Sequence, residues 1–318
     1  MYLFTKECTN RPDAGLFSAL FIAVIPAIIA RGSAGSYDNE AVAIFALVNT
    51  FYLWIKACNT GSILWSVACT LSYFYMVASW GGYSFIINII PVFVLGTMFI
   101  NRFTLKIYVA YSVFYTLGTI LAMLITFVNF QVMRSAEHLA SHFTFVAINL
   151  FVLGTYIKNG LEEAQVRAIM RLASSFTVVG FILLFLFLTV SGTTKISGRV
   201  MVLIDPTHAK NNSPLVQSVA EHSPSTWASY FLHMHVLVIF APVGFYYTLV
   251  HKITHGKLFL GMYGVFIAYF SCVMNRLQIV LAPAVCALSA IAVSQIIRKT
   301  TKSIRLAIIG KKQEKIEI

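Results

Sequence analysis

Long apolar runs separated by short polar breaks extend along most of this chain of 318 residues. The alternation of apolar and polar residues that marks membrane strands is absent, which excludes a transmembrane barrel. Most runs approach the length that crosses about 30 Å of hydrocarbon as a helix, although several fall short of about 20 residues. The pattern predicts an all-α polytopic membrane protein with ten spans, at residues 16–30, 41–57, 63–79, 83–99, 107–125, 143–158, 172–190, 230–250, 258–274 and 277–297.

Composition supports this class of protein. The chain is 58% hydrophobic and 11% charged, and its mean hydropathy is +0.80. Soluble domains carry about a quarter charged residues, so these values indicate an integral membrane protein. The five cysteines are an odd number that lies in or beside the apolar runs, which argues against a disulfide framework or a Cys-x-x-Cys metal site.

The net charge of +12 is distributed asymmetrically across the predicted spans. With the N-terminus in the cytoplasm, seventeen basic residues fall on the cytoplasmic side. Six fall on the other side, namely Arg31, Arg134, Lys195, Arg199, Lys210 and Arg276. Cytoplasmic loops of membrane proteins carry this excess of Lys and Arg. The charge therefore reflects topology, and it predicts anionic membrane lipid, not nucleic acid, as a partner.

The chain reads as one membrane domain. Residues 1–15 form a polar cytoplasmic segment, residues 16–297 the transmembrane domain, and residues 298–318 a basic cytoplasmic tail. Most connections are short, but the non-cytoplasmic loop 191–229 is long, and long loops in compact proteins are usually functional or disordered.

Two carboxylates, Asp38 and Glu40, lie in a short loop between two apolar runs. Charged groups near hydrocarbon are costly and are functional candidates by default. Mg²⁺ and Mn²⁺ prefer carboxylate oxygens, so the pair could supply part of a metal site. A solvated loop that caps the following helix is an equally simple interpretation.

Two further candidates fall on the same non-cytoplasmic side. Glu221 lies in the long loop, where it could approach the acidic pair or be a solvated surface glutamate. Arg276 interrupts two apolar runs, and its guanidinium could hold a phosphate by paired hydrogen bonds or lie at the membrane interface. A shared side is necessary for a shared site but does not establish one.

Taken together, the segments resemble the catalytic subunit of eukaryotic oligosaccharyltransferase, the dolichyl-diphosphooligosaccharide–protein glycosyltransferase. The resemblance runs in family order from about residue 13 to 297. It rests on the motifs Ser36-Tyr37-Asp38-Asn39-Glu40, Phe51-Tyr52-Leu53-Trp54-Ile55-Lys56, Ser79-Trp80-Gly81-Gly82-Tyr83, Ser135-Ala136-Glu137-His138, Asp205-Pro206-Thr207, Ser218-Val219-Ala220-Glu221-His222 and Met274-Asn275-Arg276-Leu277.

The resemblance implies a fold, a reaction and roles for the candidate residues. The fold would be the membrane domain of a GT-C-type glycosyltransferase in the endoplasmic reticulum, with a luminal active site. Asp38 and Glu40 would coordinate Mn²⁺ or Mg²⁺, Glu221 would hold the amide of the acceptor asparagine, and Arg276 would pair with the donor diphosphate. The reaction would transfer an oligosaccharide from dolichyl diphosphate to Asn in Asn-x-Ser/Thr of an acceptor polypeptide, and other oligosaccharyltransferase subunits would be partners.

The chain also departs from the family pattern. Ala220 stands where the family has Ser, and Asn275 stands where it usually has an apolar residue. The family begins with two more spans and a further catalytic aspartate and ends with another span and a luminal domain, so the chain would correspond to its third to twelfth spans. Without that aspartate and the luminal domain that reads the acceptor, we expect the chain as given to be inactive alone. Two alternatives remain: an inactive truncated remnant that binds the donor or partner subunits, and a transporter. A transporter predicts inverted repeats or broken helices at the midplane, and the sequence shows neither.

Overall fold

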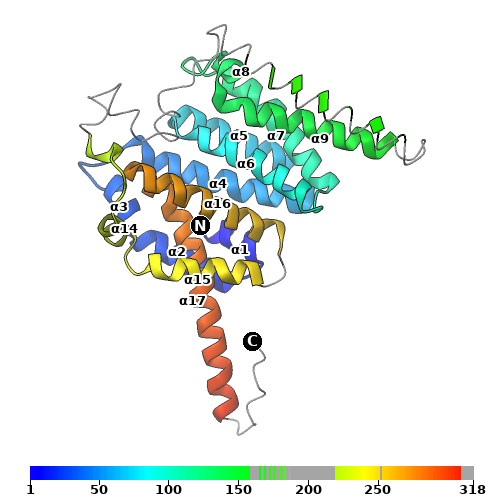
Figure 1. The fold of residues 1–318 in the computed structure, drawn as a ribbon. Helices are drawn as coiled ribbons and strands as arrows, with labels where there is room; N and C mark the ends of the chain where they lie inside the picture. The colour runs from blue at the N-terminus through cyan, green and yellow to red at the C-terminus, as the bar shows by residue number, and fades with distance from the viewer. Residues whose placement is uncertain are drawn as a thin grey trace. The chain divides into compact units, whose positions relative to one another are not determined.

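The structure is a computed structural model that describes residues 1–157, 219–250 and 253–308, and single helical positions between 165 and 186. Within these residues every regular element is a helix, which confirms the predicted all-α class (Figure 1). The chain divides into two compact units. Unit 1 comprises residues 1–44 and 219–318, and unit 2 comprises residues 45–218.

Unit 1 joins the two ends of the chain. Its helices are α1 (Tyr2–Thr9), α2 (Pro12–Val24), α3 (Pro26–Gly32), η2 (Ala220–His222), α14 (Trp227–Met234), α15 (Leu237–Val250), α16 (His255–Val273), η3 (Asn275–Leu277) and α17 (Gln278–Ile308). Unit 2 contains α5 (Ile63–Ser79), α6 (Tyr83–Phe99), α7 (Leu105–Met123), α8 (Gln131–Arg134), η1 (Ala136–His138) and α9 (Leu139–Ile157). Helix α4 (Asn39–Thr60) begins in unit 1 and continues into unit 2.

The core of unit 1 forms around α17. Buried Ala282 and Cys286 of α17 pack against Ile25 and Ala27 at the junction of α2 and α3. Close approach also shapes the unit at Gly244 in α15, where an added Cβ would lie 1.8 Å from the carbonyl oxygen of Leu288. Small residues allow helices of a membrane protein to pack this closely.

The core of unit 2 is aromatic. Trp54 of α4 has no exposed surface, and its ring lies 6.3 Å from that of Phe93 and 5.9 Å from that of Phe114. Tyr73 packs on Phe114 at 5.2 Å. Such offset and edge contacts add to the burial of apolar area.

Two of the predicted spans are bent helix pairs. The span expected at 16–30 breaks between α2 and α3 with a bend of 53°, and Pro26 opens the second helix. The span expected at 230–250 breaks between α14 and α15 with a bend of 87°, and His235 at the break has a φ of 50°. Proline has no N–H to continue the helical ladder, which explains the first break.

The predicted count of ten spans is wrong for the described residues. Five helices are long and apolar enough to cross a membrane, or up to seven if each bent pair is one span. The helices at 63–79 and 83–99 have the predicted bounds but are only 17 residues long. The expected span 172–190 and most of the loop 191–229 lie outside the continuously described residues.

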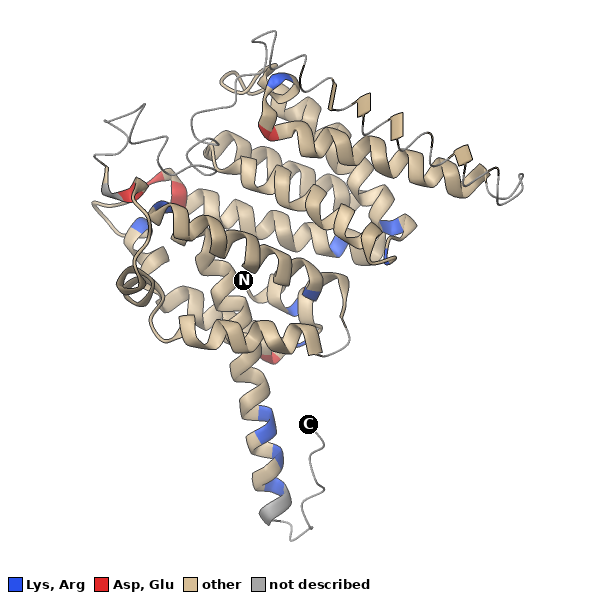
Figure 2. Cartoon of the chain, viewed as in Figure 1, with Lys and Arg blue, Asp and Glu red and all other residues tan. Residues whose placement is uncertain are grey.

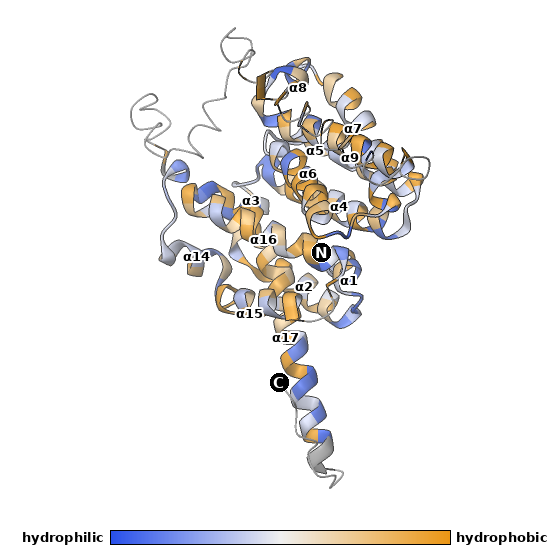
Figure 3. Ribbon diagram, turned by 45° about the vertical axis from the view of Figure 1, so that its right-hand side comes forward, coloured by the Kyte–Doolittle hydropathy of each residue, from blue (hydrophilic) through white to orange (hydrophobic). Residues whose placement is uncertain are grey.

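The ends of the chain are more regular than the sequence suggested. The N-terminal segment forms α1 and the start of α2, and α17 continues to Ile308 through the stretch that we expected to be a tail. Figure 3 shows apolar residues in the first part of α17 and polar residues in its last turns. The basic residues of those turns are visible in Figure 2.

Candidate functional site

The acidic pair lies at the start of α4, and its two carboxylates have different environments. Asp38 precedes the helix, its side chain is 41% exposed, and its Oδ1 accepts a hydrogen bond of 2.7 Å from the backbone N–H of Asn39. Glu40 lies in the first turn and its side chain is completely buried. Local capping therefore accounts for part of the role of Asp38, whereas a solvated loop does not describe Glu40.

Two arginines from opposite ends of the chain face the buried Glu40 carboxylate. Arg276 Nε, in η3, donates to Glu40 Oε1 at 2.5 Å. Arg31 Nε, in α3, lies 3.4 Å from Glu40 Oε2. A buried carboxylate requires this kind of charge compensation, because an unpaired charge away from water is strongly destabilising.

Arg31 connects Glu40 to the other candidate acids. Its Nη2 donates to Glu221 Oε1, and its Nη1 lies 4.0 Å from Asp38 Oδ2. One guanidinium group therefore lies among three carboxylates. All four predicted site residues belong to unit 1. The three acids contact Arg31 and Arg276 joins them through Glu40, so the shared side expected from the sequence is a shared cluster.

Glu221 reaches the cluster because the chain around it is anchored to the end of α16 and to η3. The backbone N–H of Asn275 donates to Ser223 O at 3.0 Å, and that of Ser225 donates to Cys272 O at 3.1 Å. The Asn275 side chain accepts from Ser229 Oγ at 2.8 Å. The polar residue at position 275, which departs from the expected pattern, thus has a structural role beside Arg276.

Arg31 is the member of the cluster that sequence reasoning missed. From the sequence, Arg31 is only one of six basic residues on the predicted non-cytoplasmic side. The sequence did hold a signal. Arg31 follows an apolar run and precedes Asp38 by seven positions, so its guanidinium is expected to pair with a nearby carboxylate. Its pairing with Glu221, 190 positions away, required the structure.

The donor set of the cluster suits a hard divalent cation. Carboxylate oxygens are the preferred ligands of Mg²⁺ and Mn²⁺. Glu40 Oε2 is buried and accepts no hydrogen bond from the residues that the structure describes. The described His, Cys, Asp and Glu side chains form no group of three that could hold a metal ion. Asp38 and Glu40 would supply two of the ligands of such an ion, and Arg31 lies within 4.0 Å of both carboxylates.

Comparison with known proteins identifies the family. Residues 1–289 match the family described as oligosaccharyl transferase STT3, N-terminal. The chain belongs to the STT3 family. This confirms the resemblance drawn from the acidic, glutamate and arginine motifs.

Curated relatives agree with this assignment. The chain is 42% identical over 305 residues to the dolichyl-diphosphooligosaccharide–protein glycosyltransferase subunit STT3 of Dictyostelium discoideum, covering 96% of this chain and 42% of the relative. It is 42% identical over 306 residues to subunit STT3B of Arabidopsis thaliana, covering 96% of this chain and 41% of the relative. The chain thus spans about two fifths of the length of these relatives.

Solved structures share the fold. The archaeal oligosaccharyltransferase AglB from Archaeoglobus fulgidus, in complex with an inhibitory peptide and a dolichol-phosphate, superposes with a TM-score of 0.71 at 16% identity. That match covers 98% of this chain and 39% of AglB. The apo form of the Archaeoglobus enzyme superposes with a TM-score of 0.68 at 18% identity. The fold is therefore that of a membrane-embedded oligosaccharyltransferase.

Proposed function

We propose that this chain supplies the membrane-embedded catalytic part of an oligosaccharyltransferase. It would transfer a preassembled oligosaccharide from dolichyl diphosphate to the asparagine of an Asn-x-Ser/Thr sequon, as a glycosyltransferase of protein N-glycosylation. The observation that carries the proposal is the cluster in which Glu40, Asp38 and Glu221 meet Arg31 and Arg276. Membership of the STT3 family supports it.

The metal in this proposal is Mn²⁺ or Mg²⁺, held by Asp38 and Glu40. When bound, it would act as a Lewis acid that stabilises negative charge on the departing diphosphate. Arg276 would bind the same diphosphate, because its guanidinium matches phosphate oxygens in bidentate geometry. Its present hydrogen bond to Glu40 holds that guanidinium next to the carboxylate pair.

Glu221 would accept a hydrogen bond from the acceptor amide. An amide nitrogen is a poor nucleophile, so carboxylates must orient and polarise it while the donor bond breaks. The anchoring of residues 223–229 on α16 and η3 supports this role, because it keeps Glu221 beside the acidic pair.

The membrane in which the chain lies, and the side on which the cluster faces, are also part of the proposal. The charge asymmetry supports a non-cytoplasmic position for the cluster. The resemblance to the family supports the endoplasmic reticulum membrane, in which that side is the lumen. Dolichol-linked donor and acceptor polypeptide would reach the site there, and other oligosaccharyltransferase subunits would bind the chain in the same membrane.

Transfer in membranes where this chain replaces the cell's own catalytic subunit tests the proposal. With lipid-linked donor and a fluorescent Asn-x-Thr peptide, we expect glycopeptide that is at least about a hundredfold reduced by Asp38→Ala or Arg276→Gln. A peptide with Gln in place of the acceptor Asn is the matched control. Transfer that both variants leave unchanged would refute the assignment. Retention of donor without any transfer would favour the donor-binding remnant.

A further inference from the structure

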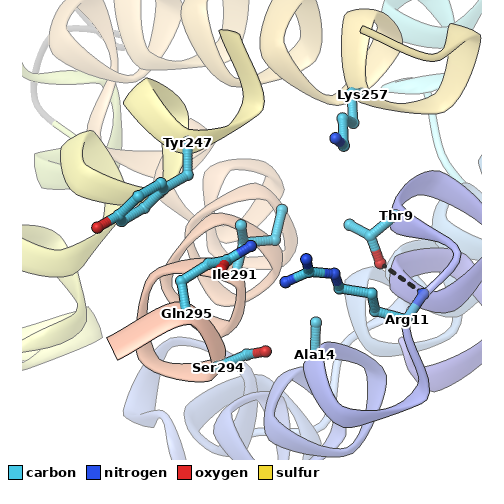
Figure 4. A pocket seen from close by; sticks show the side chains of 8 residues that line it. All are labelled: Thr9, Arg11, Ala14, Tyr247, Lys257, Ile291, Ser294 and Gln295. Atoms are coloured by element: carbon cyan, nitrogen blue, oxygen red, sulfur yellow. Dashed lines mark hydrogen bonds between the residues drawn. The ribbon is translucent and has the colours of Figure 1, made fainter. Parts of the chain in front are cut away.

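A second polar site lies in unit 1, far from the acidic cluster. It is a small cavity of about 40 Å³ that is partly open to solvent (Figure 4). Five helices meet there, and they contribute the polar side chains of Thr9, Arg11, Tyr247, Lys257, Ser294 and Gln295. No Asp or Glu is among the described residues that line it.

Two cations converge on this cavity from different helices. Arg11 is the N-cap of α2, and Lys257 lies in the first turn of α16. Figure 4 shows both side chains directed into the same space. A third cation, Lys299, has its Nζ 5.2 Å from the centre of the ring of Tyr247, one of the lining residues. Like charges placed together in a partly buried site favour an anion between them.

Arg11 provides the independent sign that a ligand belongs there. Its Nη1 is buried and has no hydrogen-bond partner among the described residues. Buried polar groups are paired in the great majority of cases, so an orphaned guanidinium N–H calls for an acceptor. Asp13 is close in sequence but accepts from Ser294 Oγ at 2.5 Å and does not line the cavity.

The chemistry of the lining indicates the class of ligand. The guanidinium of Arg11, the ammonium of Lys257 and the amide of Gln295 are donors that match the oxygens of a phosphate group. Ser294 and Gln295 stand one turn before the exposed basic stretch of α17 that contains Arg298 and Lys299. Clusters of Lys and Arg at the end of a membrane span attract anionic lipid headgroups.

The cavity is separate from the acidic cluster. Lys257 lies near the beginning of α16 and Arg276 just beyond its end. The 16 helical residues between them, 258–273, correspond to roughly 24 Å at about 1.5 Å per residue. Because α16 is one of the helices long and apolar enough to cross a membrane, the two sites lie at opposite ends of a candidate span.

We propose that this cavity binds the phosphate group of an anionic phospholipid, at the membrane face opposite the acidic cluster. Arg11 and Lys257 would neutralise the phosphate, and the side-chain amide of Gln295 would donate to its oxygens. The site is independent of the transfer reaction, so it could exist whether or not the chain is an enzyme.

Thermal unfolding of the purified chain in neutral detergent tests the proposal. The probes are dioctanoyl phosphatidylglycerol, dioctanoyl phosphatidylcholine and inorganic phosphate, titrated separately. We expect phosphatidylglycerol to raise the Tm of the wild-type chain and to bind at least about tenfold more weakly to Arg11→Gln or Lys257→Gln. Arg134→Gln, an exposed substitution in unit 2 with the same charge change, should bind as the wild type does.

The variants also give a control for folding. Arg11→Gln removes an unpaired buried donor and a neighbour of like charge, so its ligand-free Tm should not fall. If inorganic phosphate binds as tightly as the lipid, the cavity is a phosphate site but the proposal that a phospholipid occupies it is wrong. If phosphatidylglycerol binds neither wild type nor variant, or binds Arg11→Gln and Lys257→Gln as tightly as the wild type, the proposal is wrong.

Discussion

Glu40 carries a carboxylate in a position with no exposed surface, and Arg276 and Arg31 are the cations that face it. Side chains with a formal charge are almost never fully buried without such partners. The pair with Arg276 joins α4 to η3 across 236 positions of sequence. This ion pair therefore holds an N-terminal and a C-terminal segment of unit 1 together, in addition to its place in the acidic cluster.

A double-mutant cycle measures this pair. Arg276→Gln should lower the free energy of unfolding by up to about 3–5 kcal/mol, because Glu40 stays buried with one remaining cation. Adding Glu40→Gln should recover part of that loss, so the coupling energy in chemical unfolding should exceed about 1 kcal/mol. Asp38→Asn, at an exposed position, should cost less than about 1 kcal/mol. Strictly additive effects would show that the pair contributes nothing.

The Arg31 guanidinium lies 3.4 Å from Glu40 and 4.0 Å from Asp38, the two carboxylates proposed to bind the divalent cation. Arg31→Gln should therefore increase the affinity of the chain for Mn²⁺ by at least about tenfold, because a positive charge within about 4 Å of the ligands is removed. Electron paramagnetic resonance of free Mn²⁺ measures this without any turnover. Arg298→Gln, outside the cluster, should leave the affinity unchanged. Weaker binding by Arg31→Gln would instead mean that Arg31 orients the carboxylates for the metal.

The sequence identified Asp38, Glu40, Glu221 and Arg276 because charges beside hydrocarbon are few and their motifs match a family. It could not identify which charges pair. Whether Arg276 faces a ligand or Glu40 depends on how α3, α4 and η3 meet, and that depends on packing between segments more than 200 positions apart. The central place of Arg31 follows from the same long-range geometry.

At the scale of elements, straight helices were predictable and bends were not. Residues 63–79 and 83–99 form helices with the expected bounds. A single apolar segment in a membrane can pair its own backbone N–H and C=O groups only by forming a helix. The 87° bend at His235 lies inside a stretch that we predicted as one span, and two histidines at 233 and 235 did not by themselves indicate a break. Pro26 was a visible signal for the other bend, but it also fits the first turn of a helix.

Asn275 links η3 to the segment that carries Glu221. Asn275→Leu, which introduces the apolar type expected at this position, removes the hydrogen bond from Ser229. We expect a loss of about 0.5–1.5 kcal/mol in the free energy of unfolding. Faster amide exchange should appear in residues 223–230 and should be absent from α15. Unchanged exchange there would show that backbone hydrogen bonds alone hold the segment.

Gly244 sets the crossing of α15 and α17. Gly244→Ala places a methyl group against the backbone of Leu288, so the helices must separate. Overpacking of this kind typically costs about 1–3 kcal/mol, which should lower the Tm. Gly32→Ala is the matched control, because nothing lies within 4 Å of its added Cβ. Equal Tm values for the two variants would contradict the tight crossing.

At the scale of the whole molecule, unit 1 is built from both ends of the chain and contains both sites discussed above. The predicted side of each site follows from the distribution of Lys and Arg. Expected topology therefore places Ser36 in the lumen and Thr301 in the cytoplasm. Both positions are exposed and can carry a reporter.

Cysteine labelling in sealed microsomes checks this orientation. In a Cys272→Ser background, which removes the exposed native thiol among the five cysteines, Thr301→Cys should react with a membrane-impermeant maleimide. Ser36→Cys should react only after detergent opens the vesicles. Labelling of Ser36→Cys in intact vesicles would reverse the orientation and move the acidic cluster to the cytoplasm.

The length of α17 has a consequence for how deeply the protein sits in the bilayer. Its 31 residues correspond to roughly 46 Å, about 16 Å more than the thickness of the hydrocarbon. The excess carries Arg298, Lys299, Lys302 and Arg305, which resist entry into hydrocarbon. We therefore expect the basic end of α17 to stay among the lipid headgroups and to limit how deeply the helix, and unit 1 with it, can enter the bilayer.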